Sequence, residues 1–295
     1  MRQYLFLALA GACSTVAAQT PATNPMPDGS RDMFIGVGAQ SVPRYEGADD
    51  NRTLPLPVMQ IQWSNGIFVS GTSVGWHLSP SPSMEFGPLL AMSPRRDRDG
   101  LSLGIGSVGE SSDGRAFITG IRPGGIVPGG SEAPAENGGN KLYYMDVVKR
   151  RVLYGGFFNY YLSPKLRLTN NLTYGGGKDR NGARLHTALQ YMLEDIVPHH
   201  TVVLSAGVSV VNRANNETWF GITKDEASRS TLSFYRPDGG VQSVRASLRW
   251  NWALSPSWML TSGLQVDRLA GDAKRSPLVD RATNVYISSA LAYRF

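Results

Sequence analysis

The sequence predicts an all-β fold: a transmembrane, antiparallel, up-and-down β-barrel of about twelve strands, with fourteen strands as the alternative. Charged residues make up 18% of the 295 residues, which is below the roughly 25% usual for soluble globular proteins. After the N-terminal segment, no apolar run reaches the roughly 18 residues of a transmembrane helix. Apolar and polar residues instead alternate, as in strands that face lipid on one side and a polar lumen on the other.

Residues 1–18 have the pattern of an export signal. Arg2 supplies a positive charge, an apolar core follows, and Val16-Ala17-Ala18 is a small-residue cleavage site. There are two alternatives to this interpretation: a buried helix or strand, and a lipoprotein signal at Cys13. Cleavage after Ala18 would remove Cys13, the single cysteine, and leave a mature chain that suits an oxidising compartment. Residues 19–32 are then expected to form a periplasmic N-terminal segment.

The barrel is expected over residues 33–295, where two segments alternate most clearly. In Lys165–Tyr174 and Ser243–Trp252, apolar residues fall on one face and polar residues on the other. Each has about the ten residues that a tilted strand needs to cross a bilayer, whereas a helix would scatter the apolar residues around its circumference. A soluble β-sandwich or lipocalin-like barrel is the alternative. Similar but less clean segments are Met33–Gln40, Leu54–Trp63, Met84–Met92, Leu153–Leu162, Ala183–Met192, Thr201–Val211, Trp258–Arg268 and Asn284–Phe295.

Turn signals indicate how these strands are connected. Leu-Ser-Pro recurs at three places between apolar strands, and we expect these to be the short periplasmic turns. Longer polar connections are expected to be extracellular. The three Leu-Ser-Pro sites are residues 78–80, 162–164 and 254–256, and the long connections are residues 175–181, 212–240 and 270–283.

The strand count depends on the stretch Ile67–Leu78. Asn65-Gly66 is a hairpin signal, so an unbroken strand from Ile67 to Leu78 would put two periplasmic turns at opposite ends of the barrel. A break near Gly71–Ser73 into two short strands restores the alternation and gives twelve strands. A hairpin within Leu101–Val127 would give fourteen.

The last strand carries a candidate assembly signal. Tyr293 and Phe295 lie on the apolar face of an alternating segment, and an aromatic final residue resembles the signal read by the outer-membrane barrel-assembly machinery. An ordinary last strand is the alternative, because Phe is common in strands. We expect deletion of Phe295 to slow insertion and to lower the abundance of the protein. Unchanged abundance and folding, measured by heat-modifiable migration of envelope fractions, would count against it.

Charged residues on the polar face are candidates for the lumen of the barrel. Either they fill the lumen with ion pairs and hydrogen bonds, or they line a basic, weakly anion-selective channel; a barrel of this size permits both. The candidates are Glu85, Arg167, Arg184, Arg245, Arg249 and Asp267, with Gln265 beside Asp267.

Motifs for catalysis and cofactor binding are weak. Gly104–Gly109 matches G-x-G-x-x-G, but a turn follows it where a dinucleotide site needs a helix. His199-His200 is expected to be a solvated turn rather than a metal site. His186 shares a polar face with Arg184 and Gln190, with no serine or acidic partner identifiable beside it. We therefore expect no enzyme activity and no cofactor, and the scattered basic residues exclude nucleic acid as a partner.

Several stretches resemble the MipA/OmpV family of Gram-negative outer-membrane proteins, over roughly residues 33–295. The most specific stretch is Leu269–Val279, with Gly271, Asp272, Ala273, Ser276 and Pro277. Residues 101–140 depart from the family, and this Gly/Pro-rich segment is interpreted as a mobile extracellular insertion near 95–150. The other matching stretches are Pro43–Asp50, Pro55–Pro57, Trp219–Ile222, Tyr235–Gly240 and the Tyr-Arg-Phe end.

The resemblance implies a function in the cell envelope. It implies a scaffold in the outer membrane that links a murein hydrolase, a lytic transglycosylase, to a murein synthase. A narrow porin-like channel for small solutes and a lipid-modifying enzyme are the alternatives. The expected partners are outer-membrane lipid, the barrel-assembly machinery, the lytic transglycosylase and the synthase.

The segment Leu269–Val279 is expected to be ordered. Gly271 permits a turn, Asp272 can accept a backbone N–H, and Ser276-Pro277 directs the chain back toward the last strand. We predict that this loop folds inward or over the barrel mouth, with Asp272 bonded to backbone or to Arg268 or Arg275. A mobile surface loop is the alternative.

Overall fold

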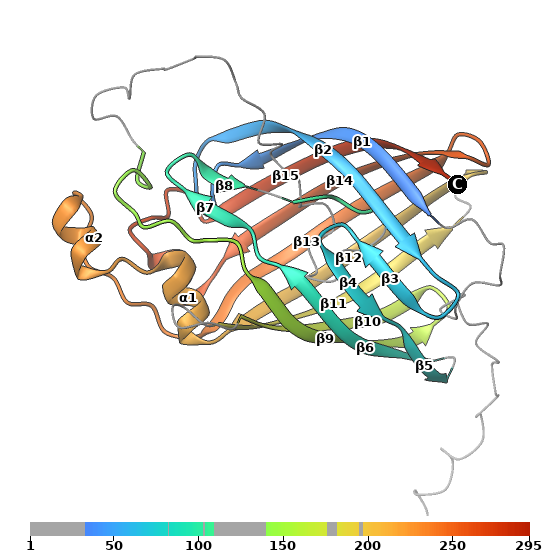
Figure 1. The fold of residues 1–295 in the computed structure, drawn as a ribbon, viewed down its shortest axis with the longest axis horizontal. Helices are drawn as coiled ribbons and strands as arrows, with labels where there is room; N and C mark the ends of the chain where they lie inside the picture. Colours follow the sequence, from blue (N-terminus) through green and yellow to red (C-terminus); the bar gives the residue numbers. More distant parts are fainter. Residues whose placement is uncertain (1–32, 82, 103, 109–139, 176–181, 195–196) are drawn as a thin grey trace, which may run out of the picture.

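The chain forms a closed antiparallel barrel in the computed structural model, which describes residues 33–81, 83–102, 104–108, 140–175, 182–194 and 197–295 (Figure 1). Twelve strands close the ring in the order β4-β3-β2-β1-β15-β14-β13-β12-β11-β10-β9-β6, and β4 pairs with β6. The ring strands are β1 (Phe34–Pro43), β2 (Asn51–Gln62), β3 (Ile67–Ser70), β4 (Ser73–Trp76), β6 (Met84–Met92), β9 (Val152–Ser163), β10 (Leu166–Gly175), β11 (Ala183–Glu194), β12 (His200–Val211), β13 (Gly240–Ala253), β14 (Trp258–Leu269) and β15 (Thr283–Arg294).

The predicted strands and their number are confirmed. Each of the ten alternating segments coincides with a ring strand. The predicted break in Ile67–Leu78 is also present: β3 and β4 form a short hairpin, and Gly71 adopts φ +58 in its turn. A residue with a Cβ resists that backbone conformation. The ring therefore has twelve strands, and the alternative of fourteen is wrong.

One predicted turn is a strand. Residues 78–80 belong to β5 (Leu78–Ser81), which pairs with β6 through Leu78↔Phe86 and Ser81↔Met84. β4 reaches only part of β6, so the free edge of β6 remains available to the chain after His77. An edge strand tolerates proline, so Leu-Ser-Pro does not by itself specify a turn. The other two Leu-Ser-Pro sites do lie at turns, between β9 and β10 and between β13 and β14.

The segment 104–108 lies against the part of β2 that the short β3 leaves without a neighbour. Gly106 accepts a hydrogen bond from Met59 N at 2.9 Å and donates one to Pro57 O at 2.8 Å. Val108 packs on the inward-facing Leu56 and Val58. A segment from the candidate nucleotide motif therefore lies along the inner wall, which is no site for a pyrophosphate.

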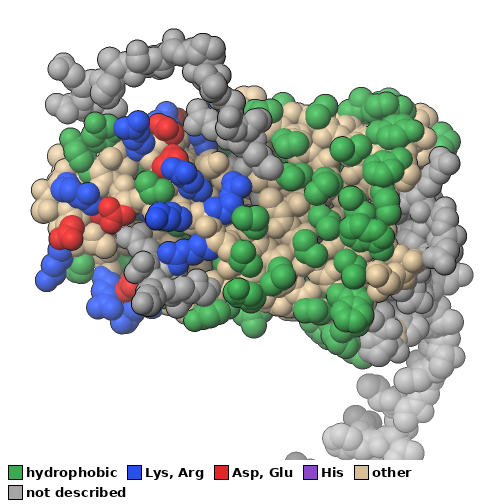
Figure 2. Space-filling view, in the orientation of Figure 1, with side chains coloured by type: hydrophobic (Ala, Val, Ile, Leu, Met, Phe, Trp, Pro, Cys, Tyr) green, Lys and Arg blue, Asp and Glu red, His purple; other side chains and the backbone are tan. Residues whose placement is uncertain are grey.

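The outer face of the barrel carries an apolar band (Figure 2). Its exposed side chains alternate with inward-facing residues, as Leu172 between the buried Asn171 and Thr173 illustrates. Val37, Tyr154 and Ile287 are further exposed members of the band. Such a band lets a barrel lie in lipid while every backbone group in the wall is paired. No helix in the described part of the chain is long and apolar enough to cross a membrane.

The long connections gather at the end of the barrel opposite the last residue and form a cap (Figure 1). The cap contains α1 (Arg213–Phe220), α2 (Lys224–Arg229), α3 (Gly271–Arg275), β7 (Arg95–Asp97) and β8 (Gly100–Ser102). We use "cap" for residues 44–50, 93–102, 140–151, 212–239 and 270–282. Two of these helices have capping side chains. Asn212 accepts from Asn215 N at the start of α1, and Thr223 accepts from Glu226 N at the start of α2, where the Glu226 carboxylate also accepts from Thr223 N.

A hydrophobic core holds the cap on the barrel. It joins strand residues such as Val42 and Tyr286 to cap residues such as Leu142, Ile222 and Leu278, all nearly inaccessible to solvent. The connections thus fold back over the mouth of the barrel rather than extending from it. The predicted export signal and the periplasmic segment, residues 1–32, lie outside the described residues, as do residues 109–139 of the predicted insertion.

Candidate functional site

The six lumen candidates all lie on the inner face of the barrel wall. Each lies an even number of residues from other buried residues of its strand, so its side chain points to the same face of the sheet. Glu85, Arg245, Arg249 and Asp267 are less than a tenth exposed, although all four are ionisable. Charged side chains are rarely buried to this degree unless they are paired, so their partners decide what the lumen can do.

Arg245 and Asp267 form the most buried ion pair among the described residues. They face each other directly on β13 and β14, and Asp267 Oδ2 accepts from Arg245 Nη2 at 2.8 Å and from Nε at 3.3 Å. Their side chains are 5% and 9% exposed. The pair neutralises two charges on the inner wall, near the cap end of β14.

A second polar cluster surrounds Glu85. Its carboxylate accepts from Asn159 Nδ2 at 2.9 Å and from Tyr161 OH at 3.0 Å, and it pairs with His77. Arg167 Nη1 donates to Tyr161 OH at 3.4 Å, which extends the cluster to a third strand. His77 was not among the sequence candidates, because it lies where β4 ends and shares no strand periodicity with Glu85.

His186 has a partner that sequence analysis did not identify. Its Nδ1 is 3.0 Å from Ser209 Oγ on the neighbouring β12, and Arg184 Nη2 also donates to this hydroxyl at 3.5 Å. A serine and a histidine in contact are the elements of a nucleophile and its base. Here both residues are almost fully buried in the wall, at 1% and 3% exposed. Only the strand register brings them together, so no sequence motif could have revealed the pair.

Part of the inner wall keeps unused hydrogen-bonding capacity. The side-chain amides of Gln40 and Gln265 are 2% and 1% exposed, and neither finds a partner among the described residues. Gln40 lies directly opposite Ser288, whose hydroxyl is likewise unpaired within the described residues. Buried amides and hydroxyls of this kind suit bound water or a polar solute.

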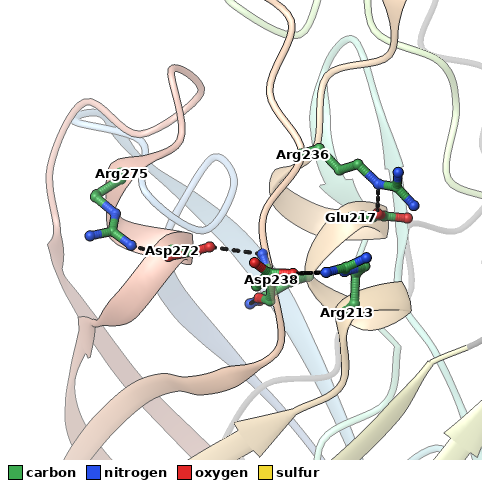
Figure 3. A network of polar contacts seen from close by, with 7 residues as sticks. Arg213, Glu217, Arg236, Asp238, Asp272 and Arg275 are labelled. Carbon is green, nitrogen blue, oxygen red and sulfur yellow. Dashed lines mark hydrogen bonds and ion pairs between the residues drawn. The ribbon is translucent and has the colours of Figure 1, made fainter.

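The contacts expected of Asp272 are present in the segment Leu269–Val279 (Figure 3). Asp272 Oδ2 accepts from Asp238 N at 2.8 Å, and Oδ1 pairs with Arg275, one of the two basic neighbours expected. Gly271 adopts φ +51 at the start of α3. Ser276 Oγ donates to Phe220 O at 2.6 Å, so the segment is attached to α1 as well.

Further ion pairs surround Asp272 on the surface of the cap. Arg213 Nε donates to Asp238 Oδ1 at 2.7 Å, and Arg236 Nε donates to Glu217 Oε1 at 2.6 Å (Figure 3). Together these contacts join α1, α3 and the connection before β13. Exposed pairs of this kind contribute little stability individually, but they fix the relative positions of three segments.

The contact between Asp272 and Asp238 is expected to depend on pH. The hydrogen bond from Asp238 N, together with Arg275, lowers the pKa of Asp272 below its ordinary value of 3.8. Because the folded-state pKa is lowered, the contact stabilises the loop above pH 3.8 and is lost as the pH falls through the lowered value. The side-chain carboxyl carbon shift of Asp272, followed by NMR, should therefore titrate with a midpoint below pH 3.8. In Asp272→Asn this titration should disappear; a midpoint at or above 3.8 in the wild type would contradict the assignment.

Aromatic side chains gather at the end of the barrel opposite the cap. Tyr293 is exposed and packs edge-on against Trp258 with ring centroids 5.1 Å apart. His200 stacks on Trp252 at 5.2 Å, so the predicted solvated His-His turn is half wrong: His200 belongs to a ring stack at the start of β12. Such rings form the girdle that an interfacial position favours. Phe295 is exposed, and its N–H donates to Met33 O at 3.0 Å.

No metal site emerges from these residues. Within the described ranges, no group of three or more His, Cys, Asp or Glu side chains could hold a metal ion. The functional candidates are therefore the polar lumen, the cap and the two rims of the barrel.

Comparison with known proteins gives a family. The sequence profile described as MltA-interacting protein MipA matches residues 35–295. The MltA-interacting proteins of Escherichia coli (strain K12) and Shigella flexneri are each 28% identical over 96 residues. That stretch is 32% of this chain and 38% of each relative, so the chain spans less than half the length of the curated relatives it matches.

Solved structures include two similar barrels. The NanC porin is 10% identical, with 89% of this chain and 100% of that chain covered and a TM-score of 0.45. The COG4313 outer membrane channel from Pseudomonas putida F1 is 11% identical, with 92% and 99% covered and a TM-score of 0.40.

Proposed function

Because the chain belongs to the MltA-interacting protein MipA family, we propose that it is an outer-membrane scaffold that binds a lytic transglycosylase on its periplasmic side. The observation that carries this proposal is the family match over residues 35–295. The name of that family records an interaction with MltA. We extend the proposal to a murein synthase as the second partner, so that hydrolysis and synthesis of the wall take place side by side.

The orientation of the barrel supports a periplasmic docking site. Outer-membrane barrels keep their short turns in the periplasm and their long connections outside. The short turns here lie beside the last residue, and the cap lies at the other end (Figure 1). A periplasmic partner would then meet the turns that contain Asn65, Lys165 and Pro256, all of which are exposed.

The interior of the barrel also favours a scaffold rather than an open pore. A conducting channel needs a continuous hydrated path, whereas the lumen here contains buried ion pairs, and the cap covers one mouth. A barrel of this kind gains stability from its polar interior and remains available for docking at its rim.

Site-specific photo-crosslinking in intact envelopes tests the proposal. A photoreactive residue is placed at Asn65, Lys165 or Pro256, and as a matched control at the exposed cap residue Lys224. We expect mass spectrometry to identify a lytic transglycosylase in the adducts from the turns and not in those from Lys224. Adducts without any murein enzyme, or the same adducts from both ends, would overturn the proposal.

A narrow channel is the second candidate function. On the inner face, Arg167, Arg184, Arg245 and Arg249 outnumber Glu85 and Asp267. The amides of Gln40 and Gln265 also have unused hydrogen-bonding capacity among the described residues. These observations favour a small anionic or polar solute. Single-channel recording in planar bilayers separates the two candidates: anion-selective steps would favour the channel, and a silent bilayer would favour the scaffold. If the protein hydrolysed phospholipid, and Ser209→Ala abolished this activity, both the scaffold and the channel would be contradicted.

A further inference from the structure

A cluster of basic side chains lies where the barrel wall continues into the cap. We call it the basic rim and define it as Arg95, Arg98, Lys149, Arg150 and Arg151. Arg95, Arg98 and Lys149 are exposed, and Arg150 and Arg151 are half-buried. Figure 2 shows basic side chains gathered beside the apolar band on this face of the molecule.

The strand ladder of the barrel positions the basic rim. The last pair of β6 and β9 is Met92↔Val152. Pairing continues beyond it, because Ser93 N donates to Arg151 O at 2.8 Å and Arg96 N donates to Val148 O at 3.0 Å. The same register places Arg95 opposite Lys149. The basic rim is therefore built on a continuation of the membrane wall and not on a free loop.

Burial of the intervening residues fixes which side chains reach the surface. Arg96 and Val148 are 3% and 7% exposed, and the guanidinium of Arg96 donates to the carbonyl of Trp219 in the cap. Side chains alternate along extended chain, so the neighbouring Arg95 and Lys149 are directed to the opposite, solvent-exposed side. Arg96 thus attaches this extension of the wall to α1, while its neighbours Arg95 and Lys149 remain accessible.

The charge of the basic rim is only partly balanced. Arg95 pairs with Asp97 at 3.3 Å. Among the described residues, no carboxylate pairs with Lys149, Arg150 or Arg98. These side chains therefore carry positive charge that an external anion can neutralise.

The basic rim lies at the level of lipid headgroups. Directly below it, Met92, Val152 and Tyr154 are exposed on the apolar band. Lys149 lies three residues from Val152, which is about 10 Å of strand. On a strand tilted by about 45° this is about 7 Å along the membrane normal, close to the roughly 5–7 Å that one headgroup layer adds to the hydrocarbon core. At the opposite end, the described turns carry a single basic residue, Lys165. The two rims therefore differ in charge.

We propose that the basic rim binds the phosphate groups of lipid headgroups in the leaflet on the cap side of the membrane. Lysine and arginine form charge-assisted hydrogen bonds with phosphate oxygens, and basic residues beside a membrane bind anionic lipid. The cluster lies on the wall above lipid-facing side chains and not in a pocket, which favours a headgroup over a dissolved anion. The inference does not depend on the scaffold proposal, because it concerns the other rim.

Lipid binding by the refolded full chain tests the inference. The protein is placed in phosphatidylcholine nanodiscs that contain bis-phosphorylated or dephosphorylated lipid A, and retained lipid is measured by native mass spectrometry. We expect the wild type to retain only the phosphorylated form. Arg95→Gln/Lys149→Gln should weaken this binding about thirtyfold, which is ~2 kcal/mol at about 1 kcal/mol for each basic residue near an anionic surface.

The matched control removes the same charge elsewhere. Lys224→Gln/Lys274→Gln changes two exposed lysines on α2 and α3 and should leave lipid retention unchanged. Heat-modifiable migration checks that both double variants fold. Equal losses in the two variants, or equal retention of dephosphorylated lipid, would overturn the inference. Displacement of lipid A by millimolar inorganic phosphate would also overturn it, in favour of a site for a dissolved anion.

Discussion

Asp267→Leu is expected to lower the free energy of unfolding by about 3–5 kcal/mol, because it leaves Arg245 buried without its carboxylate partner. Arg245 and Asp267 are 5% and 9% exposed in the lumen, so little water can replace the lost contact. Urea unfolding in phospholipid bilayers, followed by tryptophan fluorescence, measures the change. The double variant Arg245→Met/Asp267→Leu removes both charges and should recover most of the loss.

A surface ion pair provides the matched control. Glu217→Gln disrupts the pair with Arg236, whose side chain is 61% exposed, and should cost no more than about 1 kcal/mol. If Asp267→Leu cost equally little, Arg245 would be solvated in the lumen. That outcome would contradict a side-chain-filled barrel and favour the narrow channel.

The wall of the barrel could be predicted because its chemistry is local. Alternation with a period of two records which side chains face lipid, so segments such as Ser243–Trp252 are recognisable without any partner strand. Gly71 marked the break between β3 and β4, the two shortest strands of the ring, because the turn there needs a left-handed backbone. The parity of charged residues likewise placed Arg245 and Asp267 on the inner face.

Pairings across strands could not be predicted. His186 meets Ser209, and His77 meets Glu85, through a register that is set by the whole closed ring. β5 escaped prediction because a Leu-Ser-Pro sequence suits both a turn and an edge strand. The basic rim had a visible signal, the run Lys149-Arg150-Arg151 directly before an alternating strand. The sequence alone could not show that this run lies next to the apolar band, and the proposed contact with lipid headgroups depends on that position.

The helices of the cap were also missed, for a different reason. α1 and α2 are only eight and six residues long, too short to be stable helices on their own. Thr223 with Glu226 is a capping-box pair that the sequence does contain. The helices are stable because they pack against the barrel, and that packing is set by residues distant in the sequence.

Phe220→Ala is expected to destabilise the cap by about 3–5 kcal/mol, as large-to-small changes of a buried aromatic residue do. Phe220 is 0% exposed and packs against Leu269 and Ala273, between α1, the end of β14 and α3. Its loss leaves a cavity at the place where the cap meets the wall. Because the paired strands do not depend on this contact, the barrel should remain closed while the cap opens locally.

Hydrogen exchange resolved along the chain can separate local opening from global unfolding. In Phe220→Ala, amides of α1 and α3 should exchange faster by a factor of a hundred or more, following the loss of about 3 kcal/mol, while those of β11 and β12 stay protected. Phe234→Ala is the matched control, because Phe234 is an exposed cap residue, and it should change neither set. Equal acceleration in the cap and the strands would mean that the two unfold together. Unchanged exchange in α1 and α3 would mean that Phe220 does not hold the cap on the barrel.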